Sequence, residues 1–257
     1  MVSIVMATYD RAATLPRAIA SVLGQSHSDL ELIIVDDGST DTTADILRRL
    51  DDPRVRSFAL PSNRGVCAAK NAGLEQIRGD WFTILDSDDE IVPDALSAML
   101  ECAQRTGATA VTCNCRDSVT GLLTGLGPTS DRRLSPEATA RCRGEFWGLT
   151  RTCLLGDLRF DERLPGLDPS VWVLINRRAR RYYLHRPLRV YHTEGADRVT
   201  KVNRAGSFRR KVATHVALGE NRAYLGELWR VDRRMFVRTY ARVLVARSLR
   251  PFLARSL

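Results

Sequence analysis

Apolar residues follow two alternating spacings over the first hundred residues of the chain. Short apolar runs at residues 2–7, 30–35, 55–60, 81–85 and 108–113 have the length of buried strands. Helical spacing follows the first four runs, at residues 15–23, 46–50, 65–77 and 93–105. Helices placed between buried strands predict right-handed crossover units, and therefore a mostly parallel, Rossmann-like α/β sheet that is flanked by helices.

The pattern is less regular after residue 115. Residues 121–130 are rich in Gly, Pro, Ser and Thr, which is typical of a loop, while residues 168–179 predict a helix and 188–193 a strand. From about residue 206 the pattern is mostly helical and rich in arginine. We therefore expect one domain over residues 1–200, with halves at 1–115 and 116–200, and a basic helical extension over 201–257.

The net charge of +9 is unevenly distributed along the chain. Residues 1–170 hold 18 basic and 25 acidic residues, a charge of −7, whereas residues 171–257 hold 21 and 5, a charge of +16. A basic final third fits nucleic acid, an anionic membrane surface or a phosphorylated substrate. The acidic front part disfavours a protein that binds nucleic-acid backbones.

The cysteines and the apolar runs indicate the compartment. The six cysteines form no CxxC pair and have no histidine at zinc-finger spacing, so we expect reduced core thiols. No apolar run approaches the ~18 residues of a membrane-spanning helix, and the first ten residues do not have the pattern of a signal peptide. These features predict a cytoplasmic protein.

Carboxylates gather where three of the predicted strands end. Asp10 follows the first strand, Asp36 and Asp37 follow the second, and residues 86–89 (DSDD) follow the fourth. The carboxyl ends of parallel strands meet at one edge of a sheet, which is where open α/β sheets bind ligands. Adjacent carboxylates repel one another unless cations are present, and carboxylate oxygens suit Mg²⁺ or Mn²⁺. The pattern therefore predicts a divalent metal at this edge.

Two nucleotide-binding motifs are absent from the sequence. No GxGxxG follows the first predicted strand, and no GxxxxGK[ST] occurs, which disfavours a dinucleotide oxidoreductase and a P-loop NTPase. A metal held by few carboxylates usually takes its remaining ligands from substrate phosphates. The expected ligand is a metal-bound diphosphate, with the ring of Tyr9 available for a base to stack on.

Four segments together resemble the family 2 glycosyltransferases. They read VSIVMATYDRAATLPRAIASVLGQ at 2–25, ELIIVDDGSTDT at 31–42, NRGVCAAKNAG at 63–73 and GDWFTILDSDD at 79–89, in the order and spacing of that family. The resemblance is strong over residues 2–115 and weak over 145–195. It implies a GT-A fold, a nucleotide-diphosphate-sugar donor and an inverting transfer, with residues 1–115 as the donor half and 116–200 as the acceptor half.

The resemblance also implies the residues of the donor site. The nucleotide-binding positions fall on Thr8, Tyr9, Asp36, Asp37, Arg64, Lys70, Asp86 and Ser87. Asp86 and Asp88 match the D-x-D motif, in which the last carboxylate holds Mn²⁺ or Mg²⁺, and His192 is expected to complete the metal site. Many relatives have Arg-Asn where this chain has Lys70-Asn71, which keeps the charge but loses the bidentate guanidinium.

The catalytic base is expected in the second half of the chain. Relatives carry a Glu-Asp pair in a loop before a helix, and this chain has Leu167 in place of the Glu, which leaves Asp168 as the candidate base. Asp168 also suits the N-cap of the helix that follows Pro169. Asp161 and Glu162 are the alternatives for the base.

The resemblance favours a single-addition enzyme. The processive synthases of the family carry a QxxRW-type motif and membrane helices, whereas residues 227–230 (ELWR) lack the glutamine. The match of Tyr9 and Asp37 to a uracil site favours a UDP-sugar, with a glycan or lipid-linked intermediate as acceptor. Alternatives are a natural-product or peptide acceptor and, from other classes, a nucleotidyltransferase or a non-catalytic sugar-nucleotide-binding protein.

The arginines of the C-terminal extension suggest a further contact. Arg234, Arg238 and Arg242 fall four residues apart on one face of a predicted helix. The apolar residues Phe236, Tyr240, Val243 and Leu244 lie largely elsewhere. A basic amphipathic helix fits peripheral contact with the inner face of a membrane. Packing on the catalytic domain and contact with a second copy in a homodimer are the alternatives.

Overall fold

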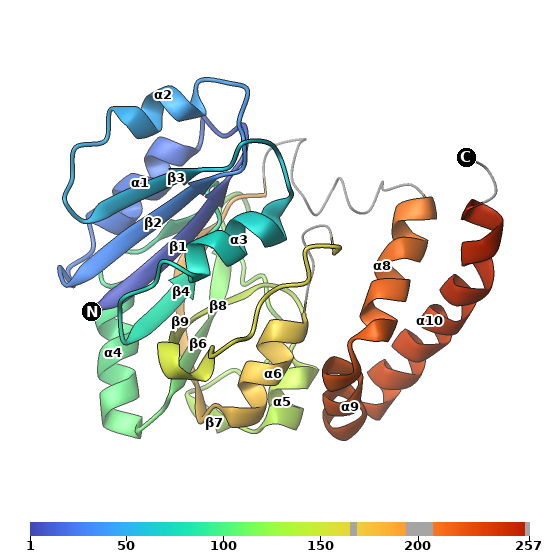
Figure 1. Ribbon diagram of the computed structural model, residues 1–257. Helices are drawn as coiled ribbons and strands as arrows, with labels where there is room; N and C mark the ends of the chain where they lie inside the picture. The colour runs from blue at the N-terminus through green and yellow to red at the C-terminus, as the bar shows by residue number, and fades with distance from the viewer. Residues whose placement is uncertain (165–168, 194–207, 255–257) are drawn as a thin grey trace.

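The computed structural model describes residues 1–164, 169–193 and 208–254. Figure 1 shows an α/β unit in which helices cover both faces of one sheet, with helices α8, α9 and α10 beside it. The strands are β1 (Val2–Thr8), β2 (Leu30–Asp36), β3 (Val55–Ala59), β4 (Trp81–Ile84), β5 (Glu90–Ile91), β6 (Ala110–Asp117), β7 (Arg132–Leu134), β8 (Phe146–Arg151) and β9 (Arg181–Tyr191).

The helices before the extension are mostly short. They are α1 (Leu15–Leu23), α2 (Thr43–Arg48), α3 (Val66–Leu74), α4 (Ala95–Thr106), α5 (Pro136–Arg141), the 3₁₀ turn η1 (Thr152–Leu154) and α6 (Ser170–Arg178). The extension comprises α8 (Phe208–Glu220), α9 (Arg222–Val231) and α10 (Arg233–Ala254). Among the described residues, no helix is both long and apolar enough to cross a membrane.

The strands are hydrogen-bonded in the order β3-β2-β1-β4-β8-β6-β9-β5, and β7 pairs with β9. The first half of the chain forms the parallel sheet that its sequence predicts, because β1 is parallel to β2 and β4, and β2 is parallel to β3. The second half differs: β8 runs antiparallel between β4 and β6. The segment that joins β6 to β8 holds loops, β7 and the two-turn helix α5 rather than a full crossover helix, so β8 returns antiparallel.

Two apolar clusters cover the two faces of the sheet. Ile4 and Met6 of β1 face α1 and α4, whereas Val5 faces α3 and α6. The alternation follows from the two-residue period of a strand. Both faces are buried, which is why β1 and β2 read as continuous apolar runs in the sequence. The result is a three-layer α/β/α core with the carboxyl ends of β1, β2 and β4 at one edge.

The helical extension is fastened to the sheet domain through α9. Leu228 and Tyr224 of α9 are buried, and α9 packs against α6. Glu227, which is 5% exposed, forms an ion pair with Arg230 at 2.5 Å and lies 3.9 Å from Arg177 of α6. A small separate cluster of Val212, Val216 and Ala246 holds α8 against α10.

Candidate active site

The ends of β1 and β2 form one side of the candidate site. Thr8 is the register partner of Asp36, and the backbone N–H of Asp37 donates to the carbonyl of Thr8 at 2.9 Å. Thr8 is 3% exposed, and its hydroxyl has no hydrogen-bond partner within the described residues. The next residue, Tyr9, is 38% exposed. A buried hydroxyl without a partner is costly unless a ligand or water satisfies it, so this edge is suited to a polar ligand.

The carboxylate of Asp37 shapes the loop that precedes α3. Its two oxygens accept hydrogen bonds from the backbone N–H groups of Arg64 and Gly65, both at 2.8 Å. Burial raises the pKa of Asp37, and the two amide donors act in the opposite direction. Gly38 permits the close approach, since its φ is +72° and a Cβ there would lie 2.7 Å from the backbone of Ser62. The turn after β2 is therefore locked to the loop before α3.

Asp36 has a structural role in the same turn. Its carboxylate accepts hydrogen bonds from both the amide and the hydroxyl of Ser39. The Ser39 hydroxyl in turn accepts from the backbone N–H of Asp10 at 2.9 Å, and Asp10 accepts from the N–H of Thr40 at 2.7 Å. Asp10 adopts a φ of +48°, a conformation that Asp tolerates better than most residues. These bonds fix the loop after β1, which carries Tyr9.

The acidic turn after β4 is balanced by basic side chains. Asp86 lies 3.2 Å from Nζ of Lys70 on α3 and 2.8 Å from Nη2 of Arg189 on β9. Burial opposes ionisation of Asp86, but Lys70 and Arg189 outweigh it and hold its pKa well below the ordinary value. Arg189 also forms a buried ion pair with Asp89, in which Nε donates to Oδ2 at 2.8 Å. Burial raises the pKa of Asp89 to about 6, although Arg189 favours its charged form.

A second set of contacts surrounds the same turn. The backbone N–H of His192 donates to Asp89 at 2.8 Å, and its Nε2 lies 2.7 Å from Glu90 Oε1. Arg17 of α1 reaches Glu90 at 3.1 Å and donates to the carbonyl of Asp88 at 2.8 Å. Ser87 is 5% exposed. The turn is thus held by α1, α3 and β9 together.

The acidic turn fits a divalent metal only if the substrate supplies part of the metal's ligands. Within the described residues, no group of three or more His, Cys, Asp or Glu side chains is placed to hold an ion. The carboxylate of Asp86 is engaged by Lys70 and Arg189. Asp88, partly exposed beside it, stays the metal ligand that the family resemblance predicts. One or two carboxylate oxygens suit Mg²⁺ when substrate phosphates complete its shell. For His192, the Nε2 is hydrogen-bonded to Glu90, and its role as a metal ligand stays a prediction.

A segment before the candidate base is anchored to α3. The side-chain amide of Asn71 donates to the carbonyl of Phe160 and accepts from its N–H, both at 2.9 Å. Glu162 forms an ion pair with Arg64 at 2.7 Å. Arg163 pairs with Asp161 at 2.6 Å and with Glu220 of α8. The segment therefore connects the donor-side loop to the helical extension.

The candidate base itself lies outside the described residues, as does Leu167. The structure describes the two alternatives: Asp161 is paired with Arg163, and Glu162 is paired with Arg64 and accepts from Asn71 at 3.2 Å. Arg163 lowers the pKa of Asp161. The assignment of Asp168 as base stays a prediction from the family pattern.

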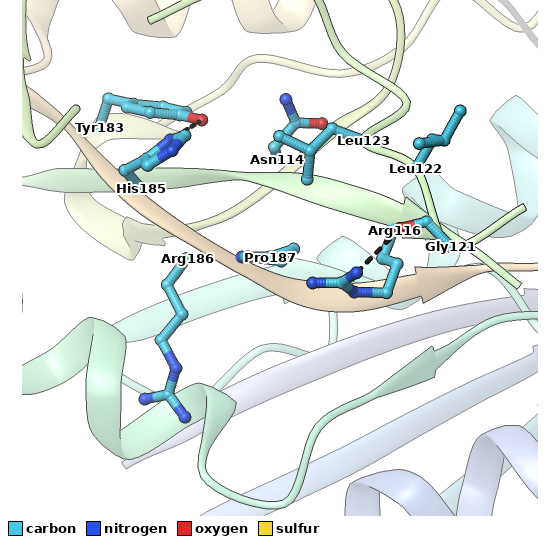
Figure 2. A pocket seen from close by; sticks show the side chains of 9 residues that line it. All are labelled: Asn114, Arg116, Gly121, Leu122, Leu123, Tyr183, His185, Arg186 and Pro187. Carbon is cyan, nitrogen blue, oxygen red and sulfur yellow. Dashed lines mark hydrogen bonds between the residues drawn. The ribbon is translucent and has the colours of Figure 1, made fainter. Parts of the chain in front are cut away.

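A cavity of about 290 Å³ lies beside β6 and β9 rather than over the acidic turn. Figure 2 shows Arg116 and Leu122 on one side of it and His185 and Arg186 on the β9 side. Leu122 is 70% exposed. Arg116 is the register partner of Val190, the residue after Arg189. The cavity therefore lies near the part of β9 that supports the acidic turn, and all of its lining residues except Asn114 follow residue 115.

Several residues of this arrangement are not signalled by local sequence. Arg189 and Asp89 are 100 positions apart, and no role is expected from the sequence for Arg189, Glu90 or Arg17. The one local sign of the buried ion pair is Arg189 itself, which stands inside the strand predicted at residues 188–193. Charged residues are rarely buried unless they are paired. Of the predicted site residues, Lys70 and Asp86 are in direct contact, and Arg64 and Asp37 are joined through the backbone.

The family model described as "Glycosyl transferase family 2" matches residues 3–154. This is more than half of the chain, and the protein belongs to that family. The GalNAc(5)-diNAcBac-PP-undecaprenol beta-1,3-glucosyltransferase of Campylobacter jejuni is 33% identical over 207 residues, covering 77% of this chain and 66% of that protein. Succinoglycan biosynthesis protein ExoO of Rhizobium meliloti is 46% identical over 107 residues, covering 42% of this chain and 31% of that protein.

Solved structures show the same fold. S. aureus TarS 1–349 in complex with UDP-GlcNAc superposes with a TM-score of 0.73 at 17% identity, covering 95% of this chain and 72% of that chain. The predicted GT-A architecture is confirmed, with the mixed sheet described above. The chain spans about two thirds of the Campylobacter relative and under a third of ExoO.

Proposed function

We propose that this chain is an inverting, non-processive glycosyltransferase that moves a sugar from a UDP-sugar to a hydroxyl of a glycan or lipid-linked intermediate. The proposal rests on one observation: Thr8, Asp37 and the acidic turn of residues 86–89 lie at the same edge of the sheet. The chain that carries this edge belongs to glycosyl transferase family 2. The Campylobacter relative is named for a PP-undecaprenol-linked acceptor, and TarS has been solved with UDP and with UDP-GlcNAc. These names support a UDP-sugar and a lipid-linked acceptor here.

The nucleobase end of the donor is assigned to Thr8, Tyr9 and Asp37. A carboxylate has about four lone-pair positions, and two backbone amides use two of those on Asp37. The remaining positions can accept a hydrogen bond from the N–H of uracil. The exposed ring of Tyr9 offers a stacking face, and the hydroxyl of Thr8 lacks a partner among the described residues.

The diphosphate end is assigned to Arg64, Lys70 and the acidic turn. Both cations are paired with carboxylates, Arg64 with Glu162 and Lys70 with Asp86, so a bound diphosphate would share them. Asp88 would hold Mn²⁺ or Mg²⁺, which would neutralise the negative charge that develops on the leaving diphosphate. Arg189 keeps Asp86 and Asp89 in place while this occurs.

The transfer step requires a base on the acceptor side. A carboxylate at Asp168 would take the proton from the acceptor hydroxyl as that oxygen attacks the anomeric carbon and the diphosphate leaves. One in-line displacement inverts the anomeric configuration. Asp161 and Glu162 remain alternatives for this role. The cavity beside Arg116 lies on the half of the chain assigned to the acceptor. A natural-product or peptide acceptor is the alternative acceptor class.

A panel of nucleotide-sugars tests the proposal without knowledge of the acceptor. The protein is incubated with UDP-, GDP- and dTDP-sugars in Mn²⁺ or Mg²⁺, and released nucleoside diphosphate is measured. Release of UDP from one or a few UDP-sugars, above a control without enzyme, supports the proposal. Formation of UTP and sugar 1-phosphate from the UDP-sugar only when pyrophosphate is added, without release of UDP, identifies a nucleotidyltransferase. UDP-sugar binding without any UDP release, also in the presence of lipid-linked acceptors, identifies a non-catalytic binding protein.

A further inference from the structure

Helix α10 presents an apolar stripe that faces away from the rest of the protein. Val237, Tyr240, Leu244 and Val245 are 58%, 39%, 50% and 58% exposed. Together with Ala241 they occur at i, i+3, i+4, i+7 and i+8, which places them on one face of the helix. We call these five residues the outer stripe. Single exposed apolar residues are ordinary, but a contiguous row of them usually marks a contact surface.

The opposite face of α10 fixes this orientation. Val243 and Ala246 are 0% and 3% exposed and pack toward Val212 and Val216 of α8. The packing is close, since a Cβ added at Gly219 of α8 would collide with the side chain of Val243. Figure 1 shows α10 on the far side of α8 from the sheet. The outer stripe is therefore exposed because the other apolar face of the helix is already buried.

Arginines border the outer stripe on both sides. With 100° per residue, Arg234, Arg238 and Arg242 fall along one border and Arg233 and Arg247 along the other. On this second border, Arg247 donates to the carbonyl of Gly219 of α8 at 3.0 Å and Arg233 lies over the ring of Trp229. Residues 233–254 contain no Asp or Glu. The three arginines of the first border are exposed, and none of them forms an ion pair within the described residues. From the sequence we expect the arginines on one face of this helix and the apolar residues largely elsewhere. In the structure, α10 has apolar residues on two opposite faces, one buried against α8 and one exposed.

Aromatic side chains extend the surface at the start of α10. Trp229, the third-last residue of α9, is 48% exposed and packs edge-to-face on Phe236 at 5.0 Å between ring centroids. Phe236 stacks on Tyr240 at 5.4 Å. Trp and Tyr combine an apolar body with a polar tip and favour the boundary between lipid and water.

We propose that the outer stripe and its bordering arginines dock this protein on the surface of an anionic lipid bilayer. The apolar residues would enter the headgroup region, and Arg234, Arg238 and Arg242 would contact anionic lipids. A second copy of the chain fits less well, since pairing two outer stripes would bring arginine borders with no acidic residues together. Nucleic acid would leave the stripe uncovered. The inference stands on α10 and Trp229, whatever sugar the protein transfers.

Vesicle binding of the full chain tests the proposal. We expect the protein to sediment with vesicles of 7:3 phosphatidylcholine and phosphatidylglycerol but not with phosphatidylcholine alone, and to be released by high salt. Changing Arg234, Arg238 and Arg242 together to Gln should weaken binding about a hundredfold, on typical values for basic residues at such surfaces. The matched control changes Arg49, Arg78 and Arg132 to Gln, three exposed arginines outside the extension, and should bind within about threefold of the wild type.

Two further measurements distinguish lipid docking from docking of a second copy and from binding through another surface. Leu244→Ser with Val245→Ser removes apolar area without changing charge and should also weaken vesicle binding, while UDP binding stays unchanged. The fluorescence of Trp229 should shift to the blue with anionic vesicles, and Trp229→Phe should lose that shift. Wild-type protein that ignores anionic vesicles at low salt overturns the proposal. Unchanged binding of the arginine variant, or a dimer in solution that the Ser variant dissociates, overturns it in favour of another surface or a second copy.

Discussion

The guanidinium of Arg189 and the carboxylate of Asp89 form an ion pair in which the side chains are only 5% and 1% exposed. Arg189 lies on β9 and also contacts Asp86, so one arginine from the second half of the chain supports the acidic turn of the first half. A buried carboxylate that loses its cation is left uncompensated in a medium of low polarity. We therefore expect this ion pair to contribute both to the free energy of unfolding and to the affinity for the donor.

Arg189→Met should lower the free energy of unfolding by about 3–5 kcal/mol, because Asp89 remains buried without a cation and keeps only the hydrogen bond from the N–H of His192. UDP affinity should fall as well, since Asp86 loses one of its two cations. Chemical denaturation and calorimetric titration with UDP measure the two effects. Arg186→Met is the matched control: Arg186 is on the same strand, and its pair with Asp94 has side chains 50% and 45% exposed, so its loss should cost about 1 kcal/mol or less. Equal stability of the two variants would contradict the assignment.

Asp37→Asn should weaken UDP binding tenfold or more. An amide has one oxygen where the carboxylate has two, so one of the bonds from Arg64 N–H and Gly65 N–H is lost or weakened, together with the charge. A hydrogen bond to a charged group is worth about 1.5–3 kcal/mol. Asp45→Asn, on the exposed part of α2, is the control and should bind UDP normally. Unchanged UDP affinity in Asp37→Asn would remove this residue from the donor site.

Asp88→Ala should abolish transfer and weaken donor binding in Mn²⁺ or Mg²⁺, while the thermal unfolding midpoint stays close to that of the wild type. The reason is the loss of the expected carboxylate ligand for an ion whose other ligands come from phosphate. Asp80→Ala, which changes a carboxylate 75% exposed, should leave transfer intact. Full activity of the wild type in excess chelator would show that the reaction does not depend on a divalent metal.

Asp168→Asn should reduce kcat about 10²-fold or more, on general-base magnitudes, with little change in donor affinity. Asp161→Asn and Glu162→Gln serve as comparisons, because these are the two alternative carboxylates. Steady-state kinetics with a fixed acceptor distinguish the three. If Asp168→Asn turns over normally and one of the others does not, the base is reassigned to that residue.

Thiol labelling should separate one cysteine from the rest. Cys153 is exposed, whereas Cys67, Cys102, Cys113 and Cys115 are buried and Cys142 is intermediate. Burial raises the pKa of Cys115 to about 12, so at pH 8 almost no reactive thiolate is present at that position. A disulfide reagent should therefore modify about one thiol rapidly, and Cys153→Ser should remove that phase. Rapid modification of several thiols in the folded protein would contradict the burial of these four cysteines on α3, α4 and β6.

The periodic part of the sequence predicts the fold well. The alternation of apolar runs and helices predicts β1 to β4 and their parallel pairing, because β1, β2 and β4 are largely buried on both faces and each crossover is long enough to form a helix. Strand β3, at the edge of the sheet, is only partly buried. Strands β5 and β7 have two and three residues, too short for a periodic signal. Strand β8 contains Gly148, where a Cβ would meet the carbonyl of Val111, and a glycine in a run lowers its strand signal.

The candidate site is less accessible to sequence reasoning. Strand ends indicate which carboxylates share an edge, and the expected metal follows from their mutual repulsion. That argument leaves out the basic side chains that the fold delivers from elsewhere. Lys70 and Arg189 already balance Asp86, and Arg189 reaches it from a position 103 residues away. Contacts of this range depend on tertiary packing, which no local pattern encodes.

The double ion pair of Arg163 has a consequence for how this protein could be recombined with its relatives. Arg163 joins Asp161, in the segment anchored to α3, to Glu220 at the end of α8. A chimera that received a foreign C-terminal tail would lose the carboxylate at position 220 unless the donor sequence supplied one. Because the side chains of Arg163 and Glu220 are 57% and 44% exposed, that loss should cost about 1 kcal/mol or less. A hybrid would depend far more on the buried residues of α9, such as Leu228, that pack beside α6.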